Sequence, residues 1–242
     1  MTAKETPKFT GITIHRDPRG RFVVRYPTGW HTFEIRSDEP LVDSSAFRVP
    51  RSELSANSEL GTANGELEPA GREGIGFAPD AHDPHTALTV WAAPLEEPAV
   101  AEDLEPLKAG LDEGLRQLDD CRVELASDTV LGNLLRFERI YTFRERPQHT
   151  PSPIARSNGA EAPPAVRKRK QWLLYVDRWL LCVTWQGSDP QTYDYWLAMA
   201  NQCFLTFEIP EALWFYTDRE LLAQLRPGST GSTGNPDRPG SD

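Results

Sequence analysis

The sequence predicts an α+β fold in which an antiparallel β-sheet is flanked by helices. Short runs of apolar residues recur between turn residues, which is typical of strands. Two longer stretches carry apolar residues at spacings of three and four, which is typical of amphipathic helices. Several connections between neighbouring strands are too short for a parallel crossover. Hydrophobic residues make up 38 % of the 242 residues, enough for a packed core.

The first part of the chain predicts five strands. Residues 9–15 and 21–26 are expected to form a hairpin, because the tetrapeptide Asp17-Pro18-Arg19-Gly20 between them has Pro second and Gly fourth, as in a type I turn. Three more strands are predicted over residues 30–35, 74–78 and 87–92. The last two flank a polar turn, so we expect a second hairpin there.

An amphipathic helix is predicted over residues 100–120, because five leucines fall on one face: Leu104, Leu107, Leu111, Leu115 and Leu118. Four strands follow, over residues 122–126, 134–144, 170–176 and 179–185. The last two are joined by Asp177-Arg178, short enough for a tight hairpin. A second helix is expected over residues 192–204, before a short apolar segment. The whole pattern favours an antiparallel meander with two helices packed on it.

The domain organisation follows from composition. We expect one domain over residues 1–216, with an acidic insertion at 37–73 and a Pro-rich loop at 147–166. Residues 217–242 predict a short helix and then a disordered tail, whose composition cannot bury enough surface to offset its ordering entropy.

Charge and cysteine content restrict the function. Lys and Arg number 26 against 36 Asp and Glu, so the formal net charge of −10 disfavours nucleic acid and anionic membranes as partners. No apolar stretch is long enough to span a bilayer, and the N-terminus lacks the apolar core of a secretory signal. The cysteines, Cys121, Cys182 and Cys203, form no CxxC motif and suit a reducing compartment as buried apolar residues. We therefore expect a cytoplasmic protein.

A family resemblance rests on four segments in a characteristic order. They are Tyr26-Pro27-Thr28-Gly29-Trp30, residues 74–95, the RFERIYTF strand at 136–143, and QWLLYVDRWLLCVTWQG at 171–187 before the final helix. In this order the chain resembles the PsbP-like superfamily, which includes the extrinsic PsbP protein of photosystem II, bacterial PsbP-like proteins and a Ran-binding nuclear import factor. The resemblance implies an α/β/α sandwich that acts as a non-enzymatic binding or assembly protein without cofactor.

Three segments are predicted to contact a protein partner. Tyr26 and Trp30 belong to the YPxGW segment, where Pro27 and Gly29 end a strand and Trp30 is expected to pack beneath the turn. The basic run Arg167, Lys168, Arg169 and Lys170 has three interpretations: a nuclear address or phosphate-binding patch, which the net charge disfavours, a set of ion pairs to Glu138 and Glu145, or a docking patch for an acidic partner. Trp214 and Phe215 either cover the sheet or form an exposed aromatic anchor.

Two alternative functions stay open. The segment PDAHDPH places Asp80, His82, Asp83 and His85 within six residues, and carboxylate with imidazole can bind Zn²⁺ or another divalent ion in a metal-dependent enzyme. The same residues are also typical of a polar turn. The second alternative is a carrier in which the sheet and the final helix enclose a small apolar ligand.

Overall fold

The computed structural model describes residues 7, 9, 11–37, 72–83, 85–132, 134–145 and 165–214. The strands are β1 (Ile12–Arg16), β2 (Val23–Pro27), β3 (His31–Ser37), β4 (Arg72–Ala78), β5 (Ala87–Pro94), β6 (Arg122–Leu131), β7 (Leu134–Glu145), β8 (Ala165–Val176) and β9 (Trp179–Gly187). The helices are the short 3₁₀ helix η2 (Ala101–Asp103), α1 (Leu104–Arg116), α2 (Pro190–Leu205) and α3 (Glu211–Trp214).

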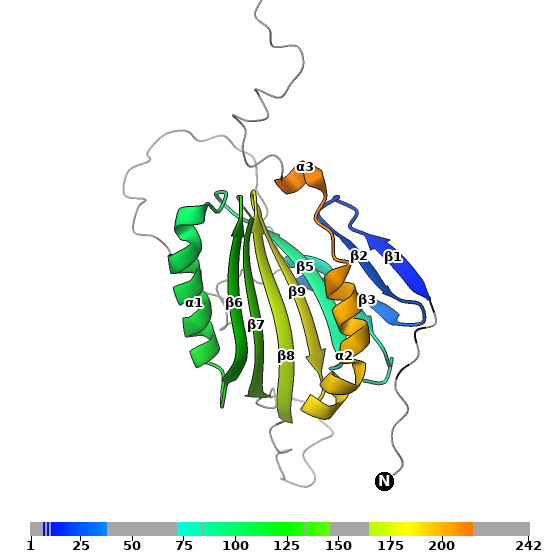
Figure 1. The fold of residues 1–242 in the computed structure, drawn as a ribbon. Helices are drawn as coiled ribbons and strands as arrows, with labels where there is room; N and C mark the ends of the chain where they lie inside the picture. The colour runs from blue at the N-terminus through cyan, green and yellow to red at the C-terminus, as the bar shows by residue number, and fades with distance from the viewer. Residues whose placement is uncertain are drawn as a thin grey trace, which may run out of the picture.

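One antiparallel sheet forms the centre of the molecule, with strand order β3-β4-β5-β9-β8-β7-β6, and β1 and β2 pair in a separate hairpin. Strands β6–β9 lie between α1 on one side and α2 on the other (Figure 1). The fold is therefore α+β with helices on both faces of the sheet, the sandwich that the sequence predicted.

Alternation along the central strands builds two separate cores. On β8, Leu173 and Tyr175 pack in the cluster that contains Leu111 and Leu115 of α1. Their neighbours Leu174 and Val176 pack in the other cluster, which contains α2 and the hairpin. Successive side chains of a strand point to opposite faces, so each central strand contributes to both cores.

The order of the strands corrects the predicted meander. Consecutive strands pair from β3 to β5 and from β6 to β9, but β5 pairs with β9 rather than with β6. Helix α1 carries the chain from β5 past three strands to the opposite edge. The pairing of β5 with β9 could not be predicted from the sequence, because a hairpin turn identifies only those neighbouring strands that it joins directly.

Several predicted boundaries also change. Strand β6 extends to Leu131 and β8 begins at Ala165, so the end of the predicted Pro-rich loop is strand. Ser37, Arg72 and Glu73, at the ends of the predicted acidic insertion, pair across β3 and β4. The rest of that insertion, most of the loop and the predicted segment 217–242 lie outside the described residues.

The start of α2 shows why the chain turns where it does. Asp189 is extended and its carboxylate accepts a hydrogen bond from the Thr192 N–H at 2.8 Å, while Pro190 occupies the first turn. An acceptor at the N-cap satisfies an N–H that has no partner in the helix, and Pro fits the first turn because it lacks an N–H.

No helix in the described part of the chain is long and apolar enough to cross a membrane.

Candidate functional site: the outer face of the N-terminal hairpin

The candidate site is the face of β1 that points away from the core. Along β1, Ile12 and Ile14 are 51 % and 50 % exposed, whereas the intervening Thr13 and His15 are half-buried. The usual orientation of a surface strand is thus reversed, with its two isoleucines in solvent. Exposed apolar residues that cluster, rather than lie singly, are a sign of an interaction surface.

Alternate side chains along the neighbouring strand β2, and Phe22 just before it, point inward, while Val23 on the opposite face is also buried. Phe22 and Val24 are buried in the α2-side core, and the Tyr26 ring packs 4.3 Å, centroid to centroid, from Phe77 of β4. On the outer face, Ile14 lies opposite Arg25 in the register. Arg25 donates to the Thr206 carbonyl at 3.1 Å and pairs with Glu208 at 3.4 Å.

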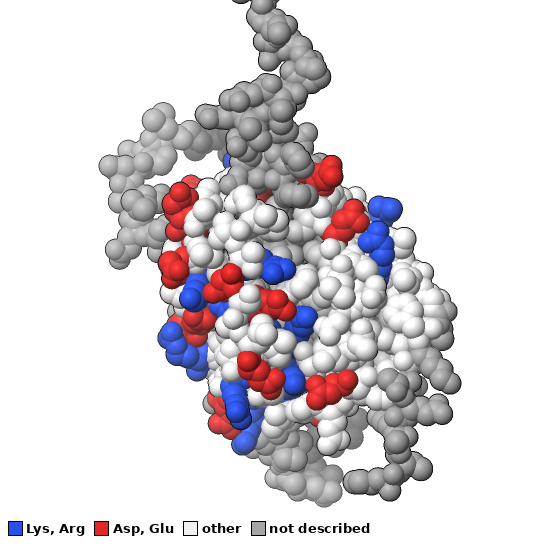
Figure 2. Space-filling model, viewed as in Figure 1, with Lys and Arg blue, Asp and Glu red and all other residues white. Residues whose placement is uncertain are grey.

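The segment after α2 completes this surface as a third strand-like edge. Val23 and Glu208 exchange two backbone hydrogen bonds of 2.8 and 2.9 Å. Leu205 precedes Thr206, whose carbonyl accepts the hydrogen bond from Arg25, and Leu205 itself is 80 % exposed. Ile12, Ile14 and Leu205, together with Arg16 and Arg25, are called the hairpin face below. Charged side chains gather over α1 and β6–β8, and they are sparser over the hairpin and α2 (Figure 2).

A buried ion pair fixes the turn of this hairpin. The Arg21 guanidinium donates two hydrogen bonds of 2.8 Å to the Asp17 carboxylate, and both side chains are almost completely buried. The backbone N–H groups of Arg19 and Arg21 also donate to Asp17. Arg21 reaches Glu73 of β4 at 3.5 Å and lies over the Trp179 ring of β9. The turn is thereby attached to the main sheet.

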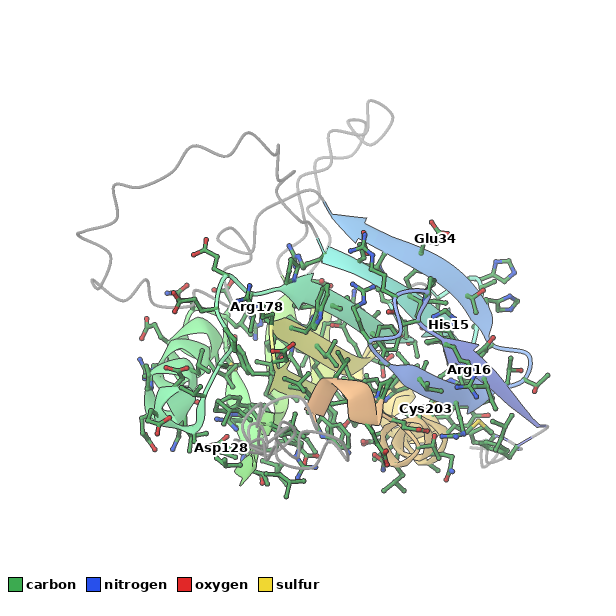
Figure 3. The ribbon with its side chains drawn as sticks, turned by 90° about the horizontal axis from the view of Figure 1, so that it is seen from above. His15, Arg16, Glu34, Asp128, Arg178 and Cys203 are labelled. Carbon is green, nitrogen blue, oxygen red and sulfur yellow. The ribbon has the colours of Figure 1, made fainter. Side chains whose placement is uncertain are left out.

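His15, labelled in Figure 3, lies on the inner side of β1, where its ring centroid is 6.1 Å from those of Phe22 and of Phe77. Burial lowers the pKa of His15, and the nearby Asp17 charge opposes this only in part. A neutral imidazole is therefore favoured there, and it acts as a packed aromatic ring.

Of the predicted YPxGW residues, Trp30 is a core residue. Gly29 has φ +98°, a conformation that glycine adopts most readily. The turn places the Trp30 indole, 8 % exposed, against Trp185 at 5.8 Å and Trp196 at 6.3 Å between ring centroids. Trp30 therefore packs as predicted. Tyr26 is half-buried against Phe77, and the contact of Tyr26 and Trp30 with a protein partner stays a prediction.

The basic run lies inside β8, and its members point to opposite faces of the sheet. Lys168 pairs with Glu124 and Asp194, and Lys170 pairs with Glu138, all on the α2 side. Burial alone would lower the pKa of Lys168, but the two carboxylates outweigh it and hold the pKa above its ordinary value.

The other two members face the α1 side. Arg167 donates to Glu145 at 2.7 Å, and Arg169 donates to Gln186 and to the Tyr141 hydroxyl. The alternative with ion pairs to Glu138 and Glu145 is thus confirmed. All four side chains have partners within the molecule, and their contact with an acidic protein partner stays a prediction.

The sequence did not single out Arg139, which is 1 % exposed on the apolar side of β7. It pairs with Asp128 of β6 at 2.5 Å and with Asp112 of α1 at 3.4 Å, and Lys108 of α1 lies 3.7 Å from Asp128. An arginine in an otherwise apolar alternation was the available signal. The cluster holds α1 on the sheet.

The PDAHDPH segment forms a turn stabilised by its own carboxylates. The Asp80 carboxylate accepts from the His82 N–H at 2.8 Å, and Asp83 accepts from the His85 N–H and from the Thr86 hydroxyl at 2.6 Å. Among the residues that the structure describes, no three His, Cys, Asp or Glu side chains form a group that could hold a metal ion. Asp80 and Asp83 therefore stabilise a polar turn, which is the other interpretation that the sequence left open.

The remaining predicted residues are a terminal aromatic segment and the cysteines. The Trp214 side chain and Phe215 lie outside the described residues, although Leu213 before them packs on the α2-side core. Cys182 and Cys203 are buried and Cys121 is half-buried. Burial raises the pKa of all three thiols, to about 12 for Cys203, so none is activated as a thiolate nucleophile.

Comparison with known proteins finds likeness only among solved structures. No family model and no curated protein matches the chain. The PsbP protein of the cyanobacterium Synechocystis sp. PCC 6803 is 8 % identical with a TM-score of 0.44, over 85 % of this chain and 98 % of that one. A Pseudomonas aeruginosa protein of unknown function, a candidate regulator, is 10 % identical with a TM-score of 0.39, over 82 % and 96 % of the two chains. The first is of the fold group that the sequence resembles, but at these values neither likeness carries an argument about function.

Proposed function

We propose that this protein is a non-enzymatic accessory factor that binds another protein through the hairpin face. The observation that carries the proposal is the reversed amphipathicity of β1, in which Ile12 and Ile14 are half-exposed while Thr13 and His15 face inward. Burying each isoleucine fully is worth about 1.5–3 kcal/mol, and part of that gain is still available at half exposure. A partner that covers both side chains recovers it.

The hairpin is also held in place before any partner arrives. Its turn is fixed by the Asp17–Arg21 pair, and its second strand is bonded to Glu208 and packed on Phe77 through Tyr26. A rigid surface loses little conformational entropy on binding, so more of the contact energy is available as affinity.

The charges around the hairpin face favour a partner with an apolar centre and an acidic rim. Arg25, which flanks Ile14 in the register, is already paired with Glu208, so the charge that favours an acidic group at this rim is that of the exposed Arg16. Charges at the rim of an interface mainly set orientation and association rate, while apolar residues at its centre supply affinity. Nucleic acid is a poorer partner, because the chain carries a net charge of −10.

The chemistry of the described residues supports a binding role over an enzymatic one. The thiols have raised pKa values, the carboxylates of the PDAHDPH turn bond to the backbone of the same turn, and His15 packs against two phenylalanine rings. None of these groups is set beside a second group that would activate it, as catalysis requires.

The proposal is tested with the variant Ile12→Thr/Ile14→Thr. Threonine keeps the β-branched shape that suits a strand but removes the apolar contact. Tagged full-length protein is used to capture partners from its native cell lysate, and a stoichiometric partner is quantified by mass spectrometry. We expect the partner bound by the unaltered protein to fall by tenfold or more, because about 1.4 kcal/mol corresponds to tenfold in affinity.

The matched control is Val100→Thr/Val166→Thr, which replaces valines of similar exposure, 43 % and 45 %, away from the hairpin face. This control should keep the partner. Circular dichroism and thermal melting check that both variants fold. Equal capture by the Ile12→Thr/Ile14→Thr variant and the unaltered protein would contradict the proposal, and so would the absence of any stoichiometric partner.

A further inference from the structure

Strand β6 is a long open edge of the main sheet. It is the last strand in the order, it pairs only with β7 in the described sheet, and its ten residues are mostly exposed. Four large apolar side chains on it are 40–60 % exposed: Val123, Leu125, Val130 and Leu131. Such an edge presents unpaired backbone N–H and C=O groups and is a template for another strand.

The devices that usually block an edge are weak on β6. The strand contains no proline and no lysine. Its carboxylates are neutralised from within the molecule, since Asp128 binds Arg139 at 2.5 Å and Glu124 binds Lys168 at 3.1 Å. A register shift between Val123 and Leu125 is the remaining irregularity, and it leaves residues 125–131 as a regular segment.

We propose that two copies of this chain associate by antiparallel pairing of β6 with β6 across a two-fold axis at Asp128. In this register Leu125 faces Leu131 of the other copy, Ala126 faces Val130, and Ser127 faces Thr129. Each pair joins like with like, either apolar with apolar or hydroxyl with hydroxyl. An axis at the neighbouring Ser127 or Thr129 would instead place Asp128 against Ala126 or Val130.

In this register, the paired residues of the two copies lie on the same side of the sheet. Pairing with β7 places Leu125, Ser127, Thr129 and Leu131 on the α2 side of β6, and Ala126, Asp128 and Val130 on the α1 side. Cross-strand neighbours must share a face. Each proposed pair does so, and the two leucine pairs bury exposed apolar surface.

The central Asp128 pair is compatible with association. Each carboxylate is drawn toward its own Arg139 and Lys108, so two opposite charges accompany it. A two-fold pairing also uses the same edge of both copies and closes, whereas head-to-tail pairing of β6 with the other edge, β3, would continue without end. This inference concerns the opposite edge of the molecule from the hairpin face and does not depend on the proposed function.

The first test is the mass of the full-length protein over a concentration series, by sedimentation velocity or light scattering. We expect a monomer–dimer equilibrium that shifts to monomer in Leu125→Lys/Leu131→Lys, since lysine is a natural blocker of sheet edges. The control Val100→Lys/Val166→Lys alters similarly exposed residues and should stay dimeric. A monomeric mass for the unaltered protein at every concentration overturns the inference, as does a dimer that the leucine variant retains.

The second test fixes the register with cysteines. Ser127→Cys/Thr129→Cys should form intermolecular disulfides on mild oxidation, because each new cysteine faces the other type across the axis. Either single variant should not, because its cysteine would face a hydroxyl residue. Efficient cross-linking of Ser127→Cys alone indicates an axis at residue 127, and that of Thr129→Cys alone an axis at residue 129; each result overturns the proposed register.

Discussion

The most buried charges in the hairpin belong to Asp17 and Arg21, and the position of the hairpin face depends on them. Their side chains are 3 % and 4 % exposed, and the carboxylate accepts four hydrogen bonds, two of them from backbone N–H groups. A buried carboxylate is tolerated only when it is paired and hydrogen-bonded in this way. The pair therefore contributes to stability as long as Asp17 is ionised.

We expect the free energy of unfolding to depend on pH through the ionisation of Asp17. Burial raises the pKa of Asp17, but the hydrogen bonds and charge of Arg21 outweigh it, so the pKa lies below its ordinary value. Stabilisation is then fully present above the unfolded pKa of about 3.9 and is lost as the pH falls through the lower folded value. Asp17→Asn should cost about 3 kcal/mol at neutral pH and flatten the acid side of the profile.

Urea unfolding between neutral and acid pH measures both effects. The control Glu97→Gln removes an exposed carboxylate and should leave the free energy of unfolding within a few tenths of a kcal/mol. Part of the acid dependence will remain in Asp17→Asn, because the pKa values of Asp83 and Asp189 are also lowered. An unchanged profile in Asp17→Asn would show that the pair does not stabilise the fold.

For single residues, the structure could be predicted from the sequence where it depends only on neighbouring residues. Pro27 and Gly29 predicted where a strand ends, and Trp30 is packed as expected, because turn chemistry and a large apolar side chain have few outcomes. The burial of Asp17 could not be inferred. The same tetrapeptide suits an exposed turn, and the partner of Asp17, Arg21, contacts Glu73 and Trp179, which are distant in the sequence.

At the scale of elements, hairpins were predictable and their neighbours were not. Asp177-Arg178 joins β8 to β9 with φ +49° at Asp177, and Asp17–Gly20 forms the expected turn, with the Gly20 N–H bonded to the Asp17 carbonyl. The contact of β5 with β9 depends on chain closure over more than eighty residues, which no local pattern records.

The candidate surfaces were missed for a related reason. Alternation in residues 12–15 is as compatible with isoleucines inward as outward. The inner side of the hairpin is occupied by Phe22, Val24 and Tyr26, which pack in or against the α2-side core. Strand β6 was cut short at its polar stretch, Ser127-Asp128-Thr129. Pairing with β7 overrides the weak strand propensity of that stretch, which the sequence alone cannot weigh.

The position of α2 on the sheet depends on its close contact with Gly187 at the end of β9. A Cβ at Gly187 would lie 2.5 Å from the Tyr193 nitrogen and 2.6 Å from its Cα, so any side chain there pushes the main chain of the helix. Gly187→Ala should destabilise the fold by about 1–3 kcal/mol through overpacking. Chemical denaturation measures the loss. Unchanged stability would show that α2 can move off the sheet without cost.

At the scale of the whole molecule, the two proposed surfaces lie at separate places. The hairpin packs over the α2-side core near β4, whereas β6 is the far edge of the sheet, beside α1 (Figure 1). The two cores lie on opposite faces of β8 and β9, and each surface is held by its own buried arginine, Arg21 for the hairpin and Arg139 for β6. The surfaces share none of these contacts.

Self-association through β6 and partner binding through the hairpin face are expected to be independent of each other. Distant sites without common contacts have additive effects, so altering one surface should leave the other unchanged. Leu125→Lys/Leu131→Lys should become monomeric yet capture the partner as well as the unaltered protein does, allowing for the loss of two-fold avidity. Ile12→Thr/Ile14→Thr should lose the partner and keep the dimer mass. If the monomeric variant also loses all partner, the binding surface must include both copies, and the hairpin face alone is not the site.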